Sequence, residues 1–88
     1  MLKKTTITWA SAADQNHADL SAARTAKLVE MARAQKVHLI EAAIVNDVTT
    51  VRYWKDQAAA EEFVAFIQDQ AATHGVSVVS AVIEDYVE

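Results

Sequence analysis

The segment VHLIEAAIVNDVTTVRYW, residues 37–54, is the feature that most limits how this chain can fold. Residues 37–45 favour a β-strand, and apolar side chains occupy both of its alternating faces. A strand with one face in water normally alternates apolar and polar residues. The second face therefore needs a cover, and a chain of 88 residues has little material left to supply one.

Hydrophobic periodicity and breaker residues predict six elements in the order β-α-β-β-α-β. Ser11 or Asn16 is expected to cap the first helix, which should end near Gln35. Asp56 is expected to cap the second helix, and Gly75, the only glycine, to end it. The apolar stripe of the second helix comprises Ala59, Phe63, Phe66, Ile67 and Ala71. The expected strands cover residues 4–9, 37–45, 48–55 and 76–87.

The two halves of the chain are similar in sequence. TTITW at residues 5–9 resembles TTVRY at 49–53, and VHLIEAAI at 37–44 resembles VSVVSAVI at 76–83. Each half is a strand, a helix and a strand, and two such units form the ferredoxin-like fold. We therefore predict that residues 1–88 form a single α+β domain of ferredoxin-like class, with a four-stranded antiparallel sheet and both helices on one face.

Alternation divides the strand residues into two faces. The more uniformly apolar set is expected under the helices and comprises Ile7, Ile40, Ala42, Ile44, Val51, Tyr53, Val79, Ala81 and Ile83. The mixed set is expected on the open face and comprises Thr6, Thr8, Val37, Leu39, Glu41, Ala43, Val45, Arg52, Trp54, Val78, Ser80, Val82 and Glu84. An open face this apolar predicts a partner over it, and we expect a homodimer.

Glu41 is a charged residue within an otherwise apolar strand. If Asn46 and Asp47 form a two-residue turn, Glu41 lies directly opposite Arg52. An opposite-charge pair across two strands contributes about 0.2–1 kcal/mol. We interpret the two residues as a structural ion pair at the subunit interface. The alternative is an acid–base or anchoring pair in a pocket.

Four residues of the open face are the candidates for binding a small apolar ligand, namely Glu41, Arg52, Trp54 and Ser80. Trp54 has two interpretations, since a tryptophan ring either stacks on a ligand or packs in a core or interface. No serine and histidine arrangement suggests a catalytic triad, and a single glycine excludes a Gly-rich phosphate loop. We therefore predict no catalytic residues.

The three histidines, His17, His38 and His74, are scattered along the chain without metal-ligand spacing, so we expect no metal and no cofactor. The net charge of −4 argues against nucleic-acid binding, and no apolar run approaches the roughly 18 residues of a membrane span. The stretch after Lys3 and Lys4 resembles a secretory signal peptide, but threonines interrupt its apolar run, so we expect a strand there instead. Together with the absence of cysteine, this predicts a cytoplasmic protein.

Residues 49–67, TTVRYWKDQAAAEEFVAFI, resemble the strand-turn-helix of the dimeric α/β-barrel superfamily. Its members include small cofactor-independent monooxygenases of the antibiotic-biosynthesis type and stress-responsive barrel proteins. The resemblance implies that two ferredoxin-like subunits pack their open sheet faces together, sometimes around a small-molecule pocket. The chain departs from the superfamily in its long first helix, its preceding polar loop and the lack of a matching catalytic set.

Three classes of function fit these observations. The preferred one is a dimeric module that binds a small molecule between the two sheets or simply assembles, because it needs only the apolar open face. The first alternative is a small enzyme of the monooxygenase or isomerase kind, for which Glu41, Arg52 and Ser80 are the available polar groups. The second is a structural or accessory component of a larger assembly, for instance a viral one.

Overall fold

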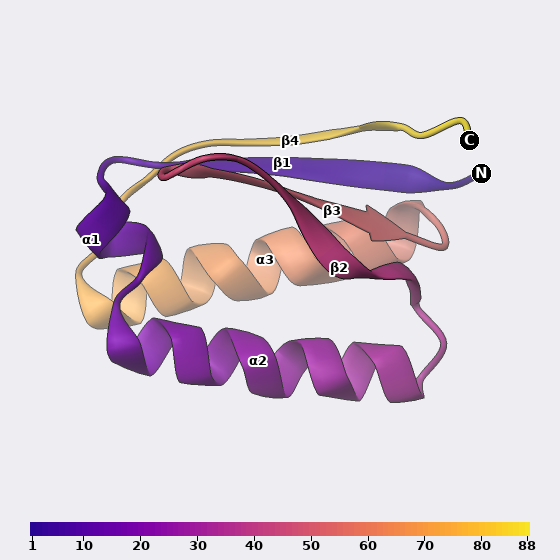
Figure 1. The fold of residues 1–88 in the computed structure, drawn as a ribbon. Helices are drawn as coiled ribbons and strands as arrows, with labels where there is room; N and C mark the ends of the chain where they lie inside the picture. Colours follow the sequence, from indigo (N-terminus) through magenta and orange to yellow (C-terminus); the bar gives the residue numbers. More distant parts are fainter.

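One antiparallel sheet with helices on one of its faces makes up the computed structural model, which describes residues 1–88 (Figure 1). The strand order is β2-β3-β1-β4, so each of the two helical crossovers spans one intervening strand. The α+β class and the four-stranded antiparallel sheet agree with the prediction. The elements are β1 (Lys3–Trp9), α1 (Ala12–Gln15), α2 (Ala18–Arg33), β2 (Val37–Asn46), β3 (Thr49–Trp54), α3 (Gln57–His74) and β4 (Val78–Asp85).

The ends of α3 follow the predicted capping residues. The Asp56 side chain accepts a hydrogen bond from the Ala59 backbone N–H at 2.9 Å, and Gly75 ends the helix with φ 69°. The first half differs, because Ser11 caps only the short extra helix α1, and His17 caps α2. None of these helices has the combination of length and apolarity that crossing a membrane requires.

The core lies between the sheet and the two long helices. Trp54 of β3 is fully buried, and its ring packs against that of Phe63 with 4.6 Å between the centroids. The Trp54 indole N–H donates a hydrogen bond to Thr5 Oγ1 at 3.0 Å, which satisfies a buried polar group. The apolar core consists of Ile7, Trp9, Leu20, Met31, Trp54, Ala59, Ala60, Phe63, Ile67 and Ala71.

The β2–β3 turn comes one residue later than predicted. The turn residues are Asp47 and Val48, and Asn46 pairs with Thr49. The Asn46 side chain accepts a hydrogen bond from the Val48 backbone N–H at 2.9 Å, which favours this later turn. A register shift between Ile44 and Asn46 then pairs Ile44 with Thr50, whereas the predicted turn would pair it with Thr49. A register shift of one residue moves every side chain of a strand to the opposite face.

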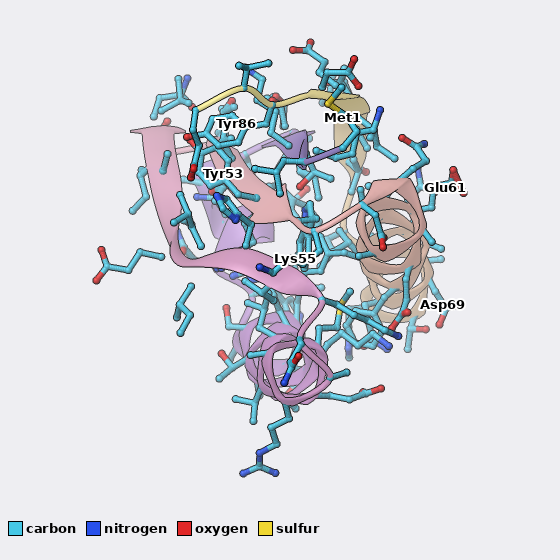
Figure 2. All side chains as sticks on the ribbon, turned by 90° about the vertical axis from the view of Figure 1, so that its right-hand side faces the viewer. Met1, Tyr53, Lys55, Glu61, Asp69 and Tyr86 are labelled. Carbon is cyan, nitrogen blue, oxygen red and sulfur yellow. The ribbon has the colours of Figure 1, made fainter.

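The prediction for the two faces of β3 is wrong, as the pairing of β3 with β1 shows. Arg52 is paired with Thr5 of β1, whose side chain is buried under the helices, and Trp54 points to the same side. Tyr53 lies on the open face instead of in the core. There its ring packs against that of Tyr86 with 4.6 Å between the centroids (Figure 2).

β2 is an edge strand, and it is more exposed than the sequence predicts. The sequence pattern predicts Ile40 and Ile44 under the helices, but their exposed fractions are 79% and 77%. Val45 is exposed as well. The pairing of β2 with β3 shifts register at three places, so the strand does not follow a regular alternation of faces. Val79 of β4, on the other edge, is also exposed instead of covered.

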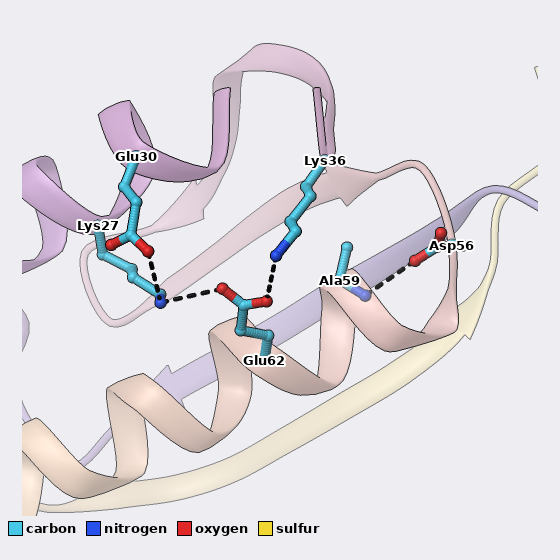
Figure 3. Close-up of polar contacts among 6 residues, drawn as sticks. All are labelled: Lys27, Glu30, Lys36, Asp56, Ala59 and Glu62. Carbon is cyan, nitrogen blue, oxygen red and sulfur yellow. Dashed lines mark hydrogen bonds and ion pairs between the residues drawn. The ribbon is translucent and has the colours of Figure 1, made fainter. Parts of the chain in front are cut away.

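Glu62 of α3 connects the two long helices and the segment before β2 (Figure 3). Its carboxylate pairs with Lys27 Nζ of α2 at 2.9 Å and with Lys36 Nζ at 2.7 Å. Lys27 Nζ also lies 3.5 Å from the Glu30 carboxylate. Hydrogen bonds from Lys36 and Lys27 lower the pKa of Glu62, and the hydrogen bond to Glu62 raises the pKa of Lys27.

These shifts predict how the Glu62 contacts respond to pH. The folded-state pKa of Glu62 is lowered. The ionised carboxylate therefore stabilises the fold fully at neutral pH, and this stabilisation is lost as pH falls through that pKa. The folded-state pKa of Lys27 is raised. The stabilisation from its protonated amine is therefore lost only as pH rises through that raised pKa. We expect Glu62→Gln to lower the free energy of unfolding at neutral pH by about 0.2–1 kcal/mol. Urea denaturation should show this loss shrinking below about pH 4; a loss independent of pH would contradict it.

Candidate functional site

A cavity of about 180 Å³ lies between the sheet and the two long helices. It reaches the surface at β2, where Ile44 is part of its lining and is mostly exposed. The apolar lining residues are Ile7, Trp9, Ala42, Ile44, Phe63 and Ile67. The polar lining residues are Thr5, Arg24, Thr50 and Arg52.

Two arginines from different elements line this cavity. Arg24 Nη2 of α2 donates hydrogen bonds to the Gln15 carbonyl oxygen at 3.1 Å and to Ser21 Oγ at 3.3 Å. The side chain of Arg52 on β3 makes no hydrogen bond or ion pair with another residue, and no lining residue is acidic. A guanidinium offers five N–H donors. Most donors of the two groups therefore have no acceptor within the protein.

The electrostatic surroundings disfavour both positive charges. Burial lowers the pKa of Arg24. Burial, and to a lesser extent the positive charge of Arg24, lowers the pKa of Arg52. A guanidinium nevertheless remains protonated in proteins. The cavity therefore combines two partly desolvated positive charges without a counter-charge. An anion beside them would offset the free-energy cost of burying each charge unpaired.

Gln15 of α1 links the walls of the cavity. Thr50 Oγ1 donates a hydrogen bond to Gln15 Oε1 at 3.0 Å, and Gln15 Nε2 donates to the Asp47 carbonyl oxygen at 3.0 Å. The Gln15 carbonyl oxygen also accepts the bond from Arg24. The extra helix α1 therefore connects the β2–β3 turn to Arg24 of α2 and helps to fix the guanidinium.

The four predicted ligand-binding residues do not form one site. Arg52 lines the cavity, but Trp54 is fully buried in the core and has no surface on which a ligand could stack. Glu41 and Ser80 are exposed, and neither lines the cavity. The predicted ion pair between Glu41 and Arg52 is wrong, because the register of β3 places Arg52 under the helices.

Arg24 is the candidate residue that the sequence reasoning missed. It lies four residues after Leu20 and four before Leu28, and both leucines belong to or pack against the core. This spacing places Arg24 on the inward-facing stripe of α2. A charged residue at a stripe position is unusual in a helix, and this was the signal available in the sequence.

Two of the three histidines, although far apart in the sequence, come together in the fold. His38 pairs with Glu88. His17 and His74, by contrast, stack with 5.2 Å between their ring centroids. They meet because α2 and α3 run in opposite directions, so the start of α2 lies beside the end of α3 (Figure 1).

The sequence matches no protein-family model and no curated protein significantly, so its function has to be argued from this geometry.

Proposed function

We propose that this chain is a small binding module that holds an anionic small molecule in the cavity between the sheet and the helices. The proposal rests on one observation: Arg24 and Arg52 both line a cavity that contains no acidic residue. Buried charges in proteins are normally paired. A carboxylate or phosphate group of a ligand would supply the partner, because guanidinium groups bind both with two parallel hydrogen bonds.

The size and lining of the cavity narrow the class of ligand. About 180 Å³ is less than the roughly 300–1,000 Å³ of sites for drug-sized ligands, so a compact carboxylic acid or phosphate ester suits it better than a nucleotide. The lining contains no histidine and no carboxylate that would act as a general base, which favours binding over catalysis. The proposed ligand is thus anionic rather than apolar, and it lies under the helices rather than between two sheets.

Thermal denaturation with small anions tests this function. Sulfate, phosphate and short mono- and dicarboxylates are compared with chloride at equal ionic strength. A ligand at 100 times its Kd stabilises the folded state by about 2.7 kcal/mol. For a domain of this size, that corresponds to a rise in Tm of roughly 10–20 °C. If no anion raises the Tm more than chloride does, the cavity is not an anion site.

We also propose that the domain is ferredoxin-like. Read from the other edge of the sheet, the strand order is β4-β1-β3-β2. The pairs joined through a long helix, β1 with β2 and β3 with β4, are each separated by one strand. This supports the split βαβ arrangement of that class.

We propose in addition that the protein is a homodimer. Leu39 of β2 and Val82 of β4 are exposed on the open face of the sheet, and Ile40 and Val45 of the edge strand β2 are exposed as well; monomers rarely expose large contiguous apolar patches. A second copy over this surface is the expected cover. Light scattering over a dilution series should give about twice the 9.6 kDa of one chain. A mass of one chain at every concentration would contradict the dimer, but it would not contradict the proposed anion site.

A further inference from the structure

Three potential metal ligands meet where α2 begins and α3 ends, away from the arginine cavity. His17 precedes α2, Asp19 lies in its first turn, and His74 is the last residue of α3. Each offers one ligand atom, and the three atoms lie within 4.8 Å of one another. The two imidazole rings are stacked, with 29° between their planes. Two distant segments of the chain therefore bring three ligating groups together.

Hydrogen bonds indicate which nitrogen atoms are available. His74 Nε2 lies 3.2 Å from Gln70 Oε1, and an N–H donated there leaves the lone pair on Nδ1. An N–H donated to a carbonyl oxygen is the usual way in which a metal-binding histidine is oriented. His17 Nδ1 accepts a bond from the Leu20 backbone N–H at 3.5 Å. That distance is long for a hydrogen bond, so little stability is lost if a metal ion takes this lone pair.

The surroundings suit a cation that arrives from solvent. The C-terminal end of α3 has a partial negative charge from the helix dipole, which favours a cation beside His74. The N-terminal end of α2 has the opposite sign, but the carboxylate of Asp19 in its first turn offsets that charge. Asp19 is exposed and both histidines are half-buried, so water can reach the group and complete a coordination shell.

We propose that His17, Asp19 and His74 bind a divalent transition-metal ion of the Zn²⁺ class. Two imidazole nitrogens and one carboxylate oxygen suit such ions, whereas Mg²⁺ and Ca²⁺ prefer oxygen ligands alone. Bonds of about 2.0–2.2 Å to zinc would draw the three ligand atoms closer together. The bound ion would link the start of α2 to the end of α3, and it would act independently of the anion cavity.

Zinc titration of the full chain without a histidine tag tests the site by calorimetry. His74→Gln removes one ligand, and His17→Asn removes another while keeping a side chain that caps helices well. Changing a group that only orients a ligand typically weakens metal binding by about 10–100-fold. Each of these two variants lacks a ligand itself, so its zinc affinity should fall by at least that factor. His38→Asn removes a histidine from outside the cluster and should leave the affinity unchanged.

Nuclear magnetic resonance of the imidazole protons separates this site from general surface binding. Adding Zn²⁺ should shift the signals of His17 and His74 and leave those of His38 in place. The proposal is overturned if the His17 and His74 signals do not move. It is also overturned if a chain that carries both His17→Asn and His74→Gln binds zinc as tightly as the unmodified chain. Circular dichroism of each variant confirms that a lost affinity does not come from unfolding.

Discussion

Replacing Phe63 by alanine is expected to lower the free energy of unfolding by about 3–5 kcal/mol. The Phe63 side chain is 2% exposed and packs against the ring of Trp54 in the centre of the core. Truncation removes buried apolar surface and leaves a void that a close-packed interior fills only partly. The total stability of an 88-residue domain is roughly 4–13 kcal/mol, so this variant should be close to unfolding at room temperature.

Phe66→Ala is the matched control for this prediction. Phe66 lies on the same helix but is only partly buried, and its ring faces Lys27 Nζ at 5.4 Å from the centroid. The same truncation at this position should cost clearly less, on the order of 1 kcal/mol. Urea denaturation of both variants measures the difference. Equal losses would contradict the placement of Phe63 at the centre of the core.

Arg52→Met is expected to change stability and anion binding in opposite directions. Without a ligand, methionine removes a partly buried charge that has no partner while filling a similar volume. The free energy of unfolding should therefore rise, by about 1 kcal/mol. Anion binding should weaken roughly 10–100-fold, because a hydrogen bond to a charged group contributes about 1.5–3 kcal/mol. The anion that stabilises the unmodified chain should therefore raise the Tm of this variant only slightly.

Arg33→Met separates this effect from a change in net charge. Arg33 ends α2 on the exposed side, so its replacement removes the same charge without touching the cavity. This variant should keep the anion-dependent rise in Tm and should not gain stability. Calorimetry with the same anion on both variants gives the Kd values. If both variants lose affinity equally, the anion is held by the overall charge of the surface and not by the cavity.

The sequence predicts α3 well because every signal for that helix is local. The carboxylate of Asp56 reaches a backbone N–H three residues ahead, and Gly75 adopts a left-handed backbone by itself. The apolar spacing that includes Phe63 and Ile67 needs no knowledge of the partner surface. The element order and the antiparallel sheet follow from the same kind of local pattern.

The candidate site could not be predicted in the same way, because it depends on pairings between strands that lie far apart in the sequence. The sequence permits a turn at Asn46 and Asp47 or at Asp47 and Val48, and the two differ by one residue. The bond from the Val48 N–H to the Asn46 side chain is present in the second turn. The side on which Arg52 lies is set instead by the pairing of β3 with β1, which places Arg52 beside the buried Thr5 and so beside the same cavity as Arg24.

β1 is the first strand of the chain to be made, yet it lies inside the sheet between β3 and β4. Thr5 pairs with Arg52 on one side and with Ile83 on the other, so both sides of the strand need partners from far along the chain. Closing such long loops costs entropy before any pair forms, which makes folding slow. A growing chain therefore keeps one row of β1 backbone hydrogen-bonding groups open until β4 has been synthesised. That row is where another nascent chain, or a chaperone, would pair with it first.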